Sequence, residues 1–187
     1  YGVLFAAIVA IPLGFAVARK RKLSRLTISI ANVMQTIPSL AMLAILMFLI
    51  GTGPNTVVFA VFLYAILPIL KNTVGGINSV TPELVDAAKG MGMTKYQIMR
   101  KVELPLAISI IMGGIRNALV LAIGVTAVGT FIGAGGLGDI ITRGITVANG
   151  SPIIIAGAIP TALMAVLADF ALGAIENKLK PRTFTKI

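Results

Sequence analysis

The chain alternates long runs without charge with short segments that carry most of its charged residues. The charge-free runs cover residues 1–18, 26–70, 117–138 and 144–168. A helix that crosses a membrane needs about 20 apolar residues, so the run 26–70 predicts two crossings with a Gly- and Pro-rich turn at 51–55. The pattern predicts an all-helical membrane protein with five spans, at about 1–18, 27–50, 56–76, 106–128 and 152–175.

Composition and charge agree with this interpretation. Hydrophobic residues make up 57% of the chain and charged residues only 12%, which is more apolar surface than a soluble core hides. Loops rich in Lys and Arg stay in the cytoplasm. All of the 16 Lys and Arg residues except Arg116 and Arg143 follow the first span, separate the third from the fourth, or end the chain. This distribution predicts an outside N-terminus and a cytoplasmic C-terminus.

Several function classes are disfavoured by the same residues. The net charge of +10 is spread over three juxtamembrane segments, which suits attraction to an anionic lipid bilayer better than nucleic-acid binding. The chain has no Cys or His, and so lacks thiolate nucleophiles, imidazole bases and the usual transition-metal ligands. Asp169 stands alone near the end of the fifth span, where we expect it to pack or cap the cytoplasmic end. We therefore expect a single non-catalytic domain over 1–187, whose native N-terminus precedes Tyr1.

A charged segment precedes the fourth span and predicts two short helices. Thr81-Pro82 has the residue types of a helix cap and first turn, and Gly90 and Gly92 would end that helix. Thr94 would cap the second helix, which we expect to end at Leu104-Pro105. Taken alone, such a segment can lie on the lipid surface as an amphipathic loop or dock a partner.

The spacing within this segment resembles the EAA loop of ABC importer permeases. Asp86-Ala87-Ala88 is followed at the family's intervals by Gly92, Val102 and Leu104-Pro105, with Asp in place of Glu and Val in place of Ile. In that family the loop forms coupling helices that seat on a cytoplasmic ATPase. The resemblance implies a coupling loop at about 81–105. It also implies these contact residues: Asp86, Ala87, Ala88, Gly90, Gly92, Val102, Leu104 and Pro105.

Other stretches resemble the permease subunit of osmoprotectant importers of the glycine betaine, carnitine and choline group. They are spread over nearly the whole chain and include QTIPSLAMLAIL, FLYAILPILKNTVGGI, IMGGIRNA and FIGAGGLGDIITRGI. The resemblance implies the transmembrane domain of a type I ABC importer in a bacterial inner membrane, passing a small quaternary ammonium solute. A permease for another small zwitterion, such as methionine or a betaine-like thiol compound, is one alternative. A passive channel or structural membrane protein is another.

The same resemblance implies partners. Two cytoplasmic ATPase subunits would hold ATP and Mg, because the chain has no G-x-x-x-x-G-K-[ST] phosphate loop and would bind no cofactor itself. A substrate-binding protein or a fused binding domain would deliver the solute. A second permease copy, identical or paralogous, would complete the pore.

Polar side chains inside the bilayer are costly unless they face protein or water. The second span carries a row of them at three- and four-residue steps, formed by Ser29, Asn32, Gln35, Thr36 and Ser39. Such a row can line a solute path or join helices by hydrogen bonds. Further path candidates are Tyr64, Arg116 and Asn117.

A G-x-G-x-x-G pattern lies between the fourth and fifth spans. Dinucleotide-binding loops with this pattern follow a β-strand in a βαβ unit, and neither is predicted here. Its glycines instead predict a tight external turn or re-entrant segment at the outer mouth, formed by Gly133, Gly135, Gly136 and Gly138.

Overall fold

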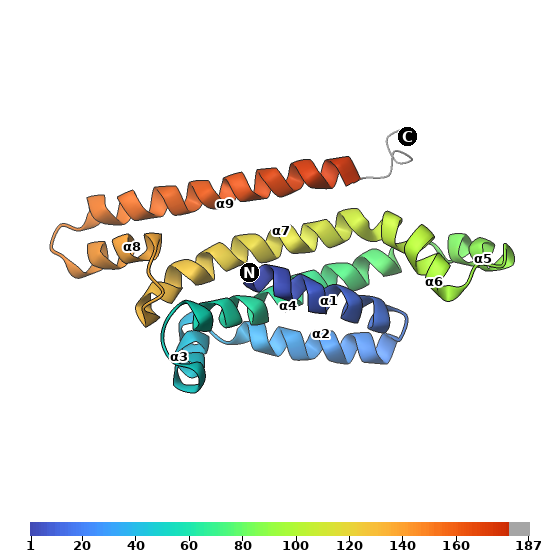
Figure 1. The fold of residues 1–187 in the computed structure, drawn as a ribbon, viewed down its shortest axis with the longest axis horizontal. Coiled ribbons are helices and arrows are strands. Elements are labelled where there is room, and N and C mark those ends of the chain that lie inside the picture. The colour runs from blue at the N-terminus through green and yellow to red at the C-terminus, as the bar shows by residue number, and fades with distance from the viewer. Residues whose placement is uncertain (180–187) are drawn as a thin grey trace.

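The computed structural model describes residues 1–179, which form helices and turns without a β-strand. Figure 1 shows α4, α7 and α9 running along the long axis, with α5 and α6 at one end and α3 and α8 at the other. The helices are α1 (Gly2–Ala18), α2 (Arg21–Thr36), α3 (Ser39–Ile50), α4 (Pro54–Asn78), α5 (Pro82–Gly90), α6 (Lys95–Ile98), a π turn (Met99–Glu103), α7 (Leu104–Val128), a 3-10 turn (Gly129–Ile132), α8 (Leu137–Thr146) and α9 (Ser151–Leu179).

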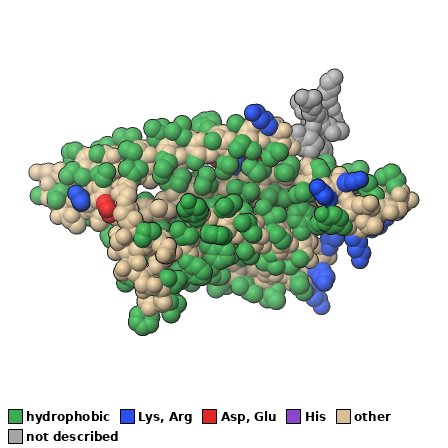
Figure 2. Space-filling view, in the orientation of Figure 1, with side chains coloured by type: hydrophobic (Ala, Val, Ile, Leu, Met, Phe, Trp, Pro, Cys, Tyr) green, Lys and Arg blue, Asp and Glu red, His purple; other side chains and the backbone are tan. Residues whose placement is uncertain are grey.

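α4 is the central helix and packs between α1 and α7. Small residues let these helices approach closely, as is usual between membrane helices. A Cβ at Gly14 would lie 2.6 Å from the Thr73 side chain, and a Cβ at Gly114 would lie 2.7 Å from the Pro68 carbonyl oxygen. α9 differs, since only 6% of its most apolar stretch is buried, and Figure 2 shows hydrophobic side chains over much of this face of the molecule.

Within residues 1–179, three helices are long and apolar enough to cross a membrane: α4, the continuous helix Lys95–Ile132 that contains α7, and α9. They match the predicted third, fourth and fifth spans. α1 is apolar but has 17 residues. The count of five spans and the outside N-terminus stay predictions.

The second predicted span, 27–50, is wrong as one continuous helix. It is split into α2 and α3, which meet at an angle of 93°. Pro38 lies in the break and has no N–H to continue the helical ladder. Because Ser39 begins α3, it does not continue the polar row of α2.

The second short helix before the fourth span does not end at Leu104-Pro105, which corrects that prediction. α6 runs through the π turn into α7, and the Leu104 N–H donates to the Met99 carbonyl. The wider π turn changes the backbone register just before Pro105, where the proline removes one N–H without ending the helix.

The glycine-rich segment before α8 forms a turn at Gly133, Gly135 and Gly136, as predicted, whereas Gly138 lies in α8. Gly133, Gly135 and Gly136 have φ of 80°, 73° and 94°, a region that side chains with a Cβ rarely adopt. The Thr130 hydroxyl donates to the Asp139 carboxylate across this turn. α8 then packs along α9 at the end of the molecule opposite α5 (Figure 1).

Candidate coupling surface and membrane path

The segment that resembles a coupling loop folds around a small apolar cluster of its own. Val80, Val85, Ala88 and Ile98 are buried in it, and Met93, Val102 and Leu106 pack against them. Ala88 is only 1% exposed, so its small side chain lets α5 lie against α6 and the π turn. Among the resemblance-derived contact residues, Ala88 therefore supports the surface from beneath.

The end of α5 is fixed by Gly92. Its φ of 78° is left-handed, its N–H donates to the Lys89 carbonyl at 2.9 Å, and the Met93 N–H donates to the Ala88 carbonyl at 3.1 Å. This pair of bonds is a Schellman motif, and Met93 supplies the apolar contact that accompanies it. The predicted end of the helix at Gly90 and Gly92 is confirmed.

The start of α6 is fixed by a capping box. The Thr94 side chain accepts from the Gln97 N–H at 3.3 Å, and the Gln97 side chain accepts from the Thr94 N–H at 2.8 Å. The predicted cap at Thr94 is confirmed. Pro82 lies at the start of α5 as predicted, whereas the Thr81 side chain forms no capping hydrogen bond.

The two caps leave an exposed ridge formed by Asp86, Ala87, Gly90 and Gly92. Asp86 is held by Lys89, whose Nζ lies 2.8 Å from its carboxylate. Of the remaining candidates, Val102, Leu104 and Pro105 are half-buried in the continuous helix. Both caps lie at the C-terminal end of the ridge, and the ridge residues themselves have small side chains, which suits a groove of a partner protein.

An ion pair between a buried carboxylate and a half-exposed arginine links this segment to the first helix. Glu103 is 4% exposed and pairs with Arg19, just after α1. A carboxylate this deep is stable only with a charged or hydrogen-bonding partner. The pairing joins residues far apart in sequence, and local spacing gave no signal for it.

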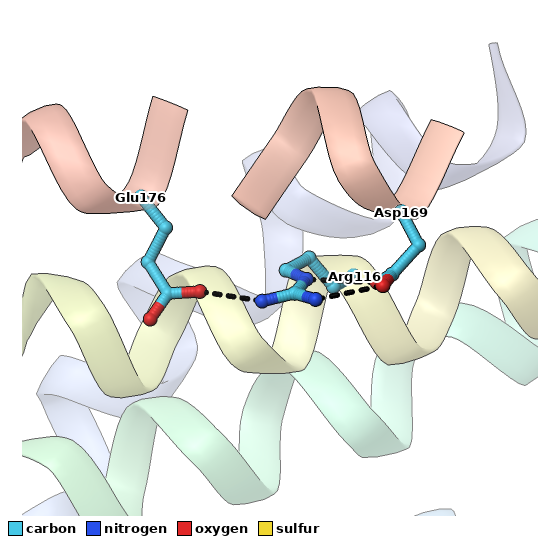
Figure 3. A network of polar contacts seen from close by, with 3 residues as sticks. All are labelled: Arg116, Asp169 and Glu176. Carbon is cyan, nitrogen blue, oxygen red and sulfur yellow. Dashed lines mark hydrogen bonds and ion pairs between the residues drawn. The ribbon is translucent and has the colours of Figure 1, made fainter. Parts of the chain in front are cut away.

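Arg116 binds two carboxylates of α9 (Figure 3). Its Nε and Nη2 donate to Asp169 at 2.8 and 2.7 Å, and its Nη1 donates to Glu176 at 2.9 Å. Gly173 lies between the two acids, where an added Cβ would contact the guanidinium at 3.4 Å. The prediction that Asp169 stands alone is therefore wrong. The signal missed was the spacing of Asp169, Gly173 and Glu176, which puts them on one face of α9.

Two candidate path residues, Gln35 and Tyr64, form hydrogen bonds near the break between α2 and α3. The Tyr64 hydroxyl donates to the Ile37 carbonyl, which the break leaves without a helical donor. The Gln35 side chain donates to the Tyr64 carbonyl at 3.0 Å, which lacks its usual donor because Pro68 has no N–H. Two backbone carbonyls that lose their helical donors near prolines are thus hydrogen-bonded by the side chains of Gln35 and Tyr64.

Replacing Tyr64 with phenylalanine should lower the free energy of unfolding by about 1–2 kcal/mol, because the Ile37 carbonyl loses its donor inside the bilayer. Thermal unfolding in detergent measures the change. Asn32→Leu is the matched control, since Asn32 is exposed on α2 and forms no side-chain hydrogen bond with residues 1–179. Equal melting temperatures for Tyr64→Phe and wild type would contradict this role.

The other predicted path residues lie apart from that junction. Asn32 and Asn117 are exposed on the surface of the single chain, and the Thr36 hydroxyl donates to the Val33 carbonyl at 2.7 Å. Two open, mostly apolar hollows of about 300 and 290 Å³ flank α7, and Thr126 lines both. Within residues 1–179, no three His, Cys, Asp or Glu side chains gather as a metal site.

Solved structures share this fold. The MetNI methionine ABC transporter, in an inward-facing conformation, matches with a TM-score of 0.85 and 23% identity over 96% of this chain and 90% of that chain. An amino acid ABC transporter solved with histidines matches with a TM-score of 0.65 and 20% identity, covering 95% and 88% of the two chains. These likenesses show the type I importer fold.

Relatives of characterised function are much closer in sequence. The carnitine transport permease protein OpuCD of Listeria monocytogenes is 62% identical over 97% of this chain and 81% of that protein. The glycine betaine/carnitine/choline transport system permease protein OpuCD of Bacillus subtilis is 60% identical over 97% and 79%. Residues 8–181 match the family of binding-protein-dependent transport system inner membrane components, and the chain belongs to that family of ABC importer permeases.

Proposed function

We propose that this chain forms the membrane path for small quaternary ammonium osmoprotectants such as glycine betaine, carnitine or choline. The observation that carries the proposal is its 62% identity to a carnitine permease over 97% of its length. The likeness to methionine transporters stands at 23% identity and supports the fold alone. Methionine and other zwitterions are therefore weaker candidates.

Energy would reach the path through the coupling segment, residues 81–105. The exposed ridge of Asp86, Ala87, Gly90 and Gly92 would enter a groove of the ATPase, while the apolar cluster beneath it transmits movement to α7. Two ATPase subunits would supply ATP and Mg and face two permease copies, identical or paralogous. A passive channel needs no such ridge, so the ridge and the capped turn at its C-terminal end favour a driven permease.

Tight recognition of the solute would belong to a binding protein or a fused binding domain. Quaternary ammonium groups are best held by aromatic cages, and this chain has no Trp and three Tyr. Tyr64 is buried with its hydroxyl committed to the Ile37 carbonyl. The hollows beside α7 would therefore offer the solute weak, transient contacts.

Uptake assays test the proposal. Cells that express the complete transporter should accumulate labelled glycine betaine, carnitine or choline at least about tenfold faster than cells with an ATPase that cannot hydrolyse ATP, because accumulation against a gradient requires the motor. Methionine should give no difference between the two strains. Accumulation of methionine alone would overturn the assignment, and uptake independent of ATP hydrolysis would favour the passive channel.

A further inference from the structure

The turn between α1 and α2 places positive charge where a helix favours negative charge. Lys20 is the N-cap of α2, and Arg21, Lys22 and Arg25 follow with no acidic residue in the first turn. The start of a helix has unpaired N–H groups and the positive end of the helix dipole, so anions stabilise it and cations do not. The basic residues at the start of α2 therefore destabilise this helix unless an anion binds near its N-terminus.

An open hollow of about 460 Å³ lies beside this turn and is lined by Ala18, Arg19, Arg21, Ser24, Arg25 and Asn78. Arg19 pairs with Glu103. Arg21 and Arg25 form no ion pair within residues 1–179. Two guanidinium groups thus line one hollow without a bound carboxylate. Figure 2 shows Lys and Arg side chains gathered toward this end of the molecule.

Ser24 gives a second, independent indication of a ligand. It is only 7% exposed and it lines the hollow. Its N–H donates to the Lys20 carbonyl at 2.9 Å, but its hydroxyl forms no hydrogen bond with the described residues. The hydroxyl is not fully enclosed by protein, so a ligand in the hollow that Ser24 lines can reach it.

We propose that this hollow binds a phosphate group. Arginine guanidinium groups match phosphate oxygens in paired hydrogen bonds, the Ser24 hydroxyl donates a further one, and the N-terminus of α2 adds its dipole. The hollow lies at the predicted cytoplasmic ends of α1 and α4, beside a leaflet that carries anionic lipids. The phosphate comes from a lipid headgroup or from free phosphate.

The test uses the complete transporter, with its ATPase, purified from nanodiscs that contain phosphatidylglycerol. Native mass spectrometry counts the lipid retained after washing. Arg21→Gln with Arg25→Gln should weaken retention at least about tenfold, because two charge-assisted contacts are lost. Lys20→Gln with Lys22→Gln is the matched control: it removes the same charge from the same turn, outside the hollow, and should change retention less than about threefold.

Inorganic phosphate distinguishes the two sources. If millimolar phosphate displaces the lipid from wild type, and raises its melting temperature but not that of the Arg21/Arg25 variant, the hollow accepts phosphate itself. If phosphate has neither effect while the arginine dependence holds, the headgroup of a membrane lipid is the source. Equal losses in the arginine and lysine variants would reveal diffuse attraction and overturn the proposal, as would unchanged retention in both.

Discussion

Replacing Arg116 with leucine should destabilise the protein, because it leaves the carboxylates of Asp169 and Glu176 without their shared cation. The melting temperature in detergent should fall by several degrees. Arg116→Lys should fall between wild type and Arg116→Leu, since an ammonium group cannot form the paired bonds to Asp169.

Two further variants show whether the unpaired carboxylates cause the loss of stability in Arg116→Leu. Arg116→Leu with Asp169→Leu should recover much of the stability, because Asp169 accepts two of the three bonds from Arg116. Asn117→Leu, an adjacent exposed position on α7, should change stability by less than about 1 kcal/mol. A double variant no more stable than Arg116→Leu would show that the ion pair does not hold α7 to α9.

The ion pair also explains why α9 can remain attached while most of its apolar surface is uncovered. Its most apolar stretch is only 6% buried, so packing against the rest of the chain holds it weakly. Arg116 adds a specific contact from α7 to Asp169 and, two turns along α9, to Glu176. The exposed apolar surface is then left for lipid or a second permease copy.

Local sequence rules predicted the parts of the fold that depend on neighbouring residues. Apolar length alone predicted α4, α7 and α9, because a membrane-spanning helix satisfies its own backbone. The ends of α5 and α6 follow from Gly92 and Thr94, which act within a few residues of themselves. The family resemblance then added the coupling role, which no local rule could supply.

Features that depend on distant partners were missed. Pro38 alone indicates only that the helix bends. In the structure α2 and α3 meet at 93°, and the Tyr64 hydroxyl donates to the Ile37 carbonyl, which has no helical donor. Arg116 and Asp169 were each considered alone, since pairing them requires knowing that α9 packs against α7. In both cases a side chain predicted to lie on the solute path, Tyr64 or Arg116, also has a partner within the protein.

Gly92→Val should reduce uptake, and solute-stimulated ATP hydrolysis, by at least about tenfold. Gly92 has a φ of 78°, and a β-branched residue is a severe outlier there. Opening the Schellman motif would withdraw Met93 from the apolar cluster and displace α6 relative to α5. No other atoms lie within 4 Å of a Cβ built at Gly92, so the backbone conformation, rather than crowding within the chain, causes the defect.

Two matched variants separate backbone conformation from added bulk on the ridge. Gly92→Asn should retain most activity, because asparagine tolerates the left-handed conformation, although it adds a larger side chain at the surface than Gly90→Ala does. Gly90→Ala should behave like wild type, since Gly90 is helical and a Cβ there meets no neighbour. If asparagine and valine at position 92 fail equally, the ridge is sensitive to bulk at the ATPase contact. The Schellman turn would then not be what couples the ATPase to α7.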